Sequence, residues 1–190
     1  MVLAATTLAV SEAIAATGVA SAPMLVERAT NVSTTLGAAS RPLAPVSRAG
    51  GSCLAEEWWG IPRDELADQV VKIVNSYRVD IGVRPLREAP SLTRSATWKA
   101  RHMAHFRYFG HSDPAPPVTR TVFQRLTACG FGSSGSENIA YGYRNAFSVV
   151  RAWLRSPGHR HNIELPRWKY IGVGVASSRG GTKFWAQNFG

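Results

Sequence analysis

Three side chains with ligand or acid–base chemistry stand where the sequence predicts helices to begin or end. His111 ends the segment FRYFGH, and Glu137 lies in the segment SENIAYG. His159 comes directly after Ser156-Pro157-Gly158, which predicts a sharp turn because proline cannot continue a helix and glycine accepts a positive φ. Imidazole and carboxylate groups are zinc ligands at catalytic sites and general acids or bases near neutral pH.

The spacing of the three residues does not define a metal motif, because 26 and 22 residues separate them. An alternative set joins His102 and His105, which are three residues apart on a predicted helix, with His111. Histidines on helices are more often exposed or satisfied in the core. His161 follows His159 by two residues, so an extended segment would aim both rings the same way and His161 could assist, although a role in binding the loop backbone is favoured.

Asn138, beside Glu137, is a further candidate in the SENIAYG segment. Asparagine side chains often hydrogen-bond the backbone of a turn, so its amide is expected to bond backbone groups of its own turn.

Three amphipathic helices must position these side chains. The first begins near Asp64, the second runs from Ser91 to about Arg107, and the third is capped by Asn145 and stops at Ser156. On the third helix, Phe147, Val150 and Leu154 are expected to share a side that Val149 and Trp153 flank, and the ring of Trp153 is expected to face inward. Apolar residues at helical spacing mark the first helix: Leu66, Val70, Ile73, Val74 and Tyr77.

Two strands complete the predicted fold. Residues 170–176 and 184–189 alternate in the manner of strands and are joined across Arg179-Gly180-Gly181, which predicts a hairpin. Helices come first and an antiparallel sheet is completed last, so the class is α+β. The region 110–136 is a long loop with a short helical piece near 122–127, and such loops are often functional.

In this order, the segments resemble the CAP domain (cysteine-rich secretory proteins, antigen 5, pathogenesis-related 1) in its bacterial, cysteine-poor form. The resemblance covers about 64–190 and rests on VNSYR at 74–78, the SENI segment, the SPGH turn, YIGVGVA at 170–176 and FWAQNFG at 184–190. It implies a three-layer α-β-α sandwich with a central antiparallel sheet. It also implies an open cleft floored by His111, Glu137 and His159.

Two residues depart from the family pattern. Ser136 stands where a glycine usually precedes the glutamate. The second glutamate of the eukaryotic tetrad has no counterpart, since only Leu154 and Arg155 separate Trp153 from the SPGH turn. Three ligands and a water would still suit Zn²⁺.

Composition divides the chain into three parts. Residues 1–22 resemble a signal peptide that ends in Ala20-Ser21-Ala22, residues 23–60 read as a disordered linker, and residues 61–190 form the CAP domain. No uncharged apolar run reaches the roughly 20 residues that span a bilayer, so no transmembrane anchor is predicted. Export is expected. Cys53 and Cys129 either stay free or pair in a bridge.

The excess of positive charge lies in the predicted domain. Residues 1–60 hold three basic and four acidic side chains, whereas residues 61–190 hold nineteen basic and eight acidic ones, and fifteen of the nineteen are arginine. Such a field favours anionic partners, although scattered arginines are more often solvated surface. The aromatic residues read as strand core rather than as a stacking platform, so no nucleic acid partner is expected.

The resemblance implies a secreted, non-enzymatic module that binds a small lipid- or sterol-like ligand, or a cell-wall or membrane component. A divalent metal such as zinc could occupy the His/Glu cleft. Two alternatives stay open: a zinc-dependent hydrolase or protease that uses His111, Glu137 and His159, and a cell-surface protein that binds polyanions. No serine or cysteine stands in a recognisable nucleophile motif, which favours the non-enzymatic interpretation.

Overall fold

The computed structural model describes residues 53–114, 116–132 and 134–190. The predicted signal-like segment 1–22 and residues 23–52 of the predicted linker lie outside this part of the chain. The described helices are α1 (Asp64–Asp80), α2 (Pro90–Phe106), α3 (Val122–Ala128), α4 (Ala146–Arg155) and α5 (Pro157–Glu164). The described strands are β1 (Ile61–Pro62), β2 (Arg87–Glu88), β3 (Ser136–Tyr141), β4 (Tyr170–Ser177) and β5 (Lys183–Phe189).

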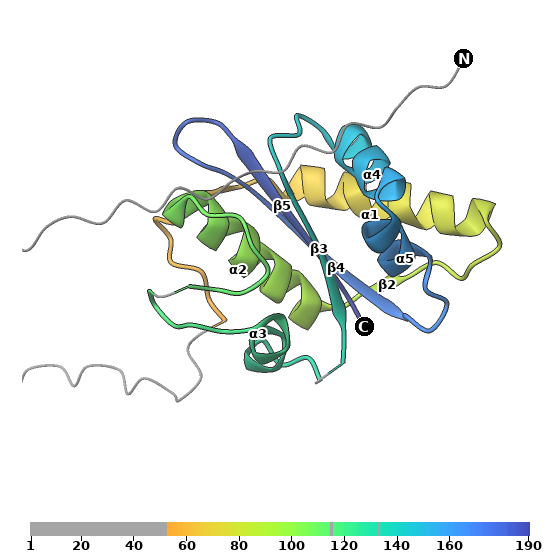
Figure 1. Ribbon diagram of the computed structural model, residues 1–190, viewed down its shortest axis with the longest axis horizontal. Helices are drawn as coiled ribbons and strands as arrows, with labels where there is room; N and C mark the ends of the chain where they lie inside the picture. Colours follow the sequence, from red (N-terminus) through yellow and green to blue (C-terminus); the bar gives the residue numbers. More distant parts are fainter. Residues whose placement is uncertain (1–52, 115, 133) are drawn as a thin grey trace, which may run out of the picture. The chain divides into compact units, whose positions relative to one another are not determined.

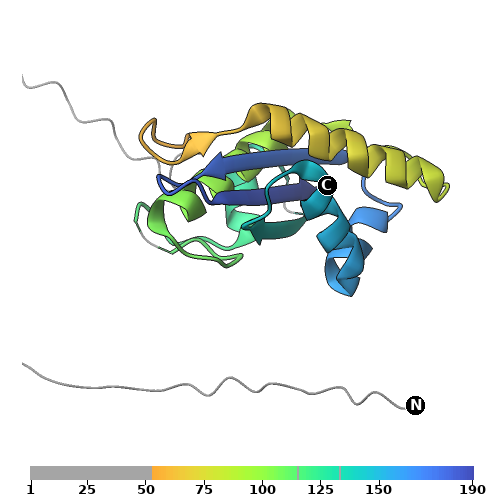
Figure 2. The same cartoon turned by 90° about the horizontal axis from the view of Figure 1, so that it is seen from above.

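The sheet forms the middle of three layers. Its order is β1-β4-β5-β3, with antiparallel pairing throughout this path, and the two-residue β2 adds to β4 in parallel. Helices α2 and α3 lie on one side of the sheet, and α1, α4 and α5 lie on the other (Figure 1, Figure 2). The chain therefore has the predicted α+β sandwich, and β3 is an edge strand of the sheet in the described part of the chain.

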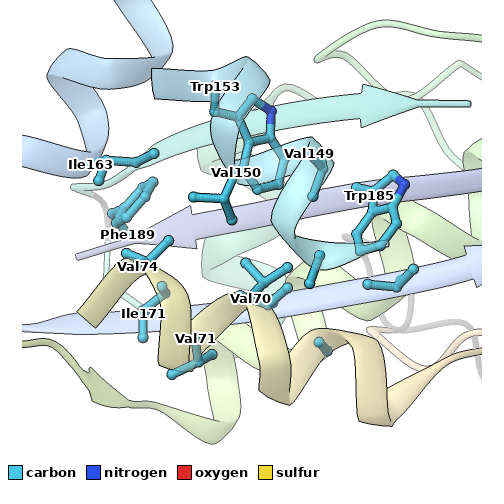
Figure 3. Close-up of a cluster of buried hydrophobic side chains, with 14 of the residues drawn as sticks. Val70, Val71, Val74, Val149, Val150, Trp153, Ile163, Ile171, Trp185 and Phe189 are labelled. Carbon is cyan, nitrogen blue, oxygen red and sulfur yellow. The ribbon is translucent and has the colours of Figure 1, made fainter. Parts of the chain in front are cut away.

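The larger core lies between the sheet and the helices α1, α4 and α5. Val70 and Val74 of α1 lie in one cluster with Val150 and Trp153 of α4 and with the strand residue Phe189 (Figure 3). All five side chains are buried. Spacings of three and four residues place these side chains on one stripe of each helix, so burial of that stripe fixes both helices on the sheet.

Close packing of α2 explains the glycines of β4. A β-carbon at Gly172 would lie 2.1 Å from the carbonyl carbon of Leu92, and one at Gly174 would lie 2.2 Å from the nitrogen of Thr97. No side chain fits between the strand and the helix backbone. The YIGVGVA segment therefore carries glycine where α2 crosses it.

The sequence-based expectation for α4 was right for Val149, Val150 and Trp153 but wrong for Phe147. The buried residues are Ala146, Val149, Val150 and Trp153, whereas Phe147, expected on the side of Val150, is 65% exposed. Spacings of three, four and seven residues from Ala146 define the core stripe, and Phe147 lies outside it. Asn145 does cap α4, since its side chain accepts a hydrogen bond from the Ser148 N–H at 2.9 Å.

Two elements of the site were not expected. Residues 157–164 form α5, so Pro157 begins a new helix at a position that tolerates proline, and the turn is made at Ser156 with extended backbone. Residues 136–141 form β3 rather than a turn. His159 and Glu137 therefore stand in regular elements, while only His111 stands in a loop.

Residues before β1 pack on the domain in the described part of the chain. Cys53 and Cys129 form a disulfide, and Trp59 is buried. The guanidinium of Arg101 donates to the backbone carbonyls of Glu56 and Trp59 at 2.7 and 2.9 Å. None of the described helices is long and apolar enough to span a bilayer.

Candidate functional site

Glu137 lies buried on the edge strand β3, opposite Asn188 of β5. One carboxylate oxygen, Oε2, accepts hydrogen bonds from Arg125 and from Asn188, the latter at 3.1 Å. The other, Oε1, is 3.0 Å from Nδ1 of His111. The structure thus brings two of the three predicted residues, His111 and Glu137, into direct contact.

Charge around Glu137 keeps it ionised. Burial alone would raise its pKa, but Arg125, then the bond from His111 and the charge of Lys99, outweigh burial and hold the pKa of Glu137 below its usual value. The imidazole of His111 is half exposed while the carboxylate is buried. A buried anion therefore orients an imidazole that faces solvent.

A buried ammonium holds the loop that carries His111. Lys99 Nζ lies 3.0 Å from the carbonyl oxygens of His111 and Ser112 and 3.0 Å from Asp113 Oδ1. Burial, and then the neighbouring Arg125, lowers the pKa of Lys99 to about 8, so the ammonium stays mostly protonated at neutral pH. Arg125 also pairs with Asp113. Lys99 and Arg125 therefore fix both the loop and the carboxylate.

His159 lies on helix α5, and its backbone carbonyl contacts the same strand, β3. The Asn138 amide donates to the His159 carbonyl at 3.1 Å, and its own oxygen accepts from Asn162 at 2.9 Å. Burial, and then the nearby His111, lowers the pKa of His159. Asn138 does bond a backbone carbonyl, but that of α5 rather than of its own turn, because Asn138 stands in a strand.

An open cleft lies beside β3 between α4, α5 and the loop after α2. Its volume is about 430 Å³. Phe109 and Tyr141 lie with their rings 4.9 Å apart at its rim, and both are half exposed. The lining residues, which we call the aromatic cleft, are Phe109, Ile139, Ala140, Tyr141, Tyr143, Ala152, Trp153, Ser156 and His159.

The donors present do not fit a three-ligand zinc centre. Both oxygens of Glu137 are already engaged by Arg125, Asn188 and His111. Among the described residues, no group of three or more histidine, cysteine, aspartate or glutamate side chains is placed to hold a metal ion. Of the two oxygens, only Oε1 is free of Arg125, and it already lies 3.0 Å from Nδ1 of His111.

Among the described histidines, His159 lines the aromatic cleft, whereas His111 and the remaining histidines do not, and Glu137 does not line it either. His161 is exposed on α5, and its expected alignment with His159 assumed an extended segment that is in fact helical. His102 is buried, with Nδ1 2.7 Å from the Tyr108 hydroxyl and Nε2 2.8 Å from the Pro116 carbonyl oxygen. His105 packs against Trp58. His102 and His105, which the alternative set would join with His111, therefore make other contacts in the structure.

Sequence reasoning did not single out Lys99, Asp113 or Arg125 as residues of the site. A signal for Lys99 was present: it falls between Ala96 and Met103 on the inward stripe of α2. A charged residue in a core stripe indicates a buried partner. Asp113 follows His111 in a loop and carries no comparable signal.

Comparison with known proteins identifies the family of this chain. The model of the CAP family, described as the cysteine-rich secretory protein family, matches residues 71–189. The uncharacterized protein YkwD of Bacillus subtilis is 34% identical over 122 residues, which is 64% of this chain and 45% of that protein. The chain belongs to the CAP family.

Two solved structures share the fold. An outer surface protein from Borrelia burgdorferi has a TM-score of 0.60 at 20% identity, over 69% of this chain and 97% of that one. An extracellular protein of Bacillus anthracis that contains an SCP domain has a TM-score of 0.59 at 25% identity, over 66% of this chain and 40% of that one. This chain spans less than half the length of YkwD and of the Bacillus anthracis protein.

Proposed function

We propose that this CAP domain is a secreted, non-enzymatic module that binds a small apolar ligand in the aromatic cleft. The cleft carries the proposal: its volume of about 430 Å³ falls within the range of small-molecule sites. Aromatic and aliphatic side chains supply most of its lining, and His159 and Ser156 supply polar groups. That combination suits a ligand with a flat apolar body and few polar atoms, such as a sterol or an acyl chain.

A binding role is favoured over hydrolysis by the state of Glu137. A general base must accept a proton from a water or a substrate, and both oxygens of this carboxylate already accept hydrogen bonds from protein groups. Its lowered pKa further weakens it as a base. Glu137 acts instead as the fixed anion that orients His111 at the sheet edge.

Export is supported by two observations. Cys53 and Cys129 are paired, and structural disulfides persist in oxidising compartments outside the cytosol. The similar Bacillus anthracis protein is described as extracellular. Both observations agree with the signal-like composition of residues 1–22.

Two fluorescent polyene lipids, dehydroergosterol and parinaric acid, test the proposal by titration of the purified chain. Saturable binding of either lipid, lost in His159→Trp, is the expected result, because the larger ring fills the cleft. His161→Trp is the matched control, since it places the same ring on the exposed side of the same helix. Failure of both lipids to bind, or equal loss in both variants, would contradict the proposal.

A further inference from the structure

Phe147 is an apolar side chain that the fold leaves outside its core. It is 65% exposed on α4, although the helix buries four other residues. Arg151 and Arg155 follow at intervals of four residues, so all three side chains lie on one outward stripe of the helix. The aromatic cleft and the core account for the other sides of α4 and leave this stripe unexplained.

This stripe borders a second hollow next to the aromatic cleft. The hollow, of about 490 Å³, is here called the α4 groove and is lined by Tyr143, Phe147, Ser148, Arg151, Ala152 and Arg155. Tyr143 and Ala152 line both hollows, so the two adjoin. Aromatic rings and arginines thus share one continuous surface beside the cleft.

Residues 90–163, which include α4, contain no exposed carboxylate. Between residues 90 and 163 the only carboxylates are Asp113 and Glu137, and both are buried against Lys99 and Arg125. The exposed carboxylates of the described residues belong to the segment before β1, to α1 and to β2, and the partly exposed Glu164 of α5 pairs with Arg160. In the described part of the chain neither Arg151 nor Arg155 forms an ion pair, so the α4 groove presents positive charge that no carboxylate pairs with.

We propose that the α4 groove docks on an anionic phospholipid bilayer. The arginines complement lipid phosphates, and each cation held at such a surface strengthens binding about fivefold. Exposed phenyl and phenol rings add burial at the level of the headgroups, where aromatic side chains are favoured. A soluble polyanion would pair with the arginines but would leave Phe147 in water, so the combination favours a lipid surface.

Docking at the α4 groove goes beyond ligand binding and does not depend on it. Because Tyr143 and Ala152 belong to both hollows, a docked bilayer would lie at the mouth of the aromatic cleft. Lipid extracted from the bilayer would then have a short path to the cleft. Bilayer docking and ligand binding in the cleft are tested with different variants, so either proposal can fail without the other.

Co-sedimentation of the full chain with vesicles of phosphatidylcholine, with and without phosphatidylglycerol, tests the proposal. We expect binding only to the anionic vesicles, with a decrease as salt rises. The double variant Arg151→Gln/Arg155→Gln should bind at least tenfold more weakly. Its control, Arg84→Gln/Arg179→Gln, changes the net charge equally at exposed positions outside the groove and should bind like the parent.

Phe147→Gln separates a bilayer from a soluble polyanion. It should weaken vesicle binding several-fold, whereas Phe123→Gln should not. Phe123 is the matched control because it is the second residue of α3, as Phe147 is of α4, and is 53% exposed. His159→Trp, which fills the cleft, should still bind the vesicles.

Three results would overturn the docking proposal. Equal losses in the groove variants and their controls would show that only net charge matters. Unchanged binding in Phe147→Gln, together with competition by soluble polyphosphate, would assign the arginines to a soluble polyanion. Binding to neither vesicle would leave the groove without this function, while lipid binding in the cleft would still stand.

Discussion

Glu137 shows how a buried charge becomes part of a surface site. The carboxylate lies inside the protein, yet its contact with His111 defines the orientation of a solvent-facing imidazole. Arg125 joins Glu137 to Asp113, and Lys99 joins Asp113 to the loop of His111. The strand, the loop and the helices around the site are therefore linked through side-chain charges rather than through backbone pairing.

Replacement of Arg125 by methionine should destabilise the domain by roughly 3 to 5 kcal/mol, because it leaves two buried carboxylates without their shared partner. Urea unfolding at neutral pH measures the loss. Exposed Arg151→Met serves as the control and should change stability by less than about 0.5 kcal/mol. A loss below about 1 kcal/mol for Arg125→Met would mean that the buried cluster reorganises around the remaining cations.

Stability should fall as pH is lowered through the histidine range. Burial lowers the pKa of His102 from 6.5 to about 4, so between these values the unfolded chain binds a proton that the folded protein excludes. His102 therefore contributes stability above pH 6.5 and loses it toward pH 4, with a slope of up to about 1.4 kcal/mol per pH unit. The lowered pKa of His159 acts in the same direction.

Urea titrations at several pH values between 7 and 4.5 test this slope. His102→Phe keeps a ring against Trp98 but cannot bind a proton, so its stability should depend less steeply on pH than that of the parent. Glu137, whose pKa is lowered, adds a separate loss only below pH 4.5. Parallel curves for the parent and His102→Phe would exclude His102 as the titrating group.

Residues of helix α4 face three different environments. Val149, Val150 and Trp153 face the core, Ala152 faces the aromatic cleft, and Phe147 faces solvent. The SPG sequence then ends the helix at Arg155 and begins α5 at Pro157. One short helix therefore contributes side chains to both the core and the aromatic cleft.

Trp153→Ala should cost roughly 3 to 5 kcal/mol of unfolding free energy, because a fully buried ring leaves a cavity. Thermal or urea unfolding measures the loss. Phe147→Ala is a matched control on the same helix and should be nearly neutral, since most of that ring is already in water. Comparable losses at the two positions would contradict the assigned helix face.

The elements differ in how far the sequence predicted them. Helices α1, α2 and α4 and the hairpin of β4 and β5 followed from apolar periodicity, and the order of motifs indicated the family. Strand β3 and helix α5 did not follow, because SENIAY begins with polar residues and because Pro157 was read only as a stop. The predicted trio contained the His111–Glu137 contact, whereas the network of Lys99 and Asp113 depends on tertiary burial that periodicity does not encode.

At the scale of the whole molecule, the disulfide joins the segment before β1 to the end of α3. Cys53 and Cys129 are 76 residues apart, so their bond closes a long loop. Trp59 is buried within that segment and packs against Trp98 of α2. The packed part of the chain thus includes residues that composition alone assigned to a linker.

The double variant Cys53→Ser/Cys129→Ser should lose about 4 kcal/mol of stability, as loop-closure entropy predicts for a loop of this size. Differential scanning calorimetry under oxidising conditions measures the shift. A chain that begins at Ile61 should lose more, because it lacks Trp59 as well as the disulfide. If that shortened chain is as stable as the double variant, Trp59 contributes nothing to the core.

The edge strand β3 also bears on how copies of this protein behave at high concentration. Trp153 Nε1 donates to the Ile139 carbonyl at 3.2 Å, and Asn162 Nδ2 reaches the Glu137 carbonyl at 3.5 Å. Exposed strand edges are templates for aggregation through strand pairing between molecules. Side chains of α4 and α5 occupy two acceptors that such pairing would use. The same helices that shape the cleft therefore protect the sheet from edge-to-edge association.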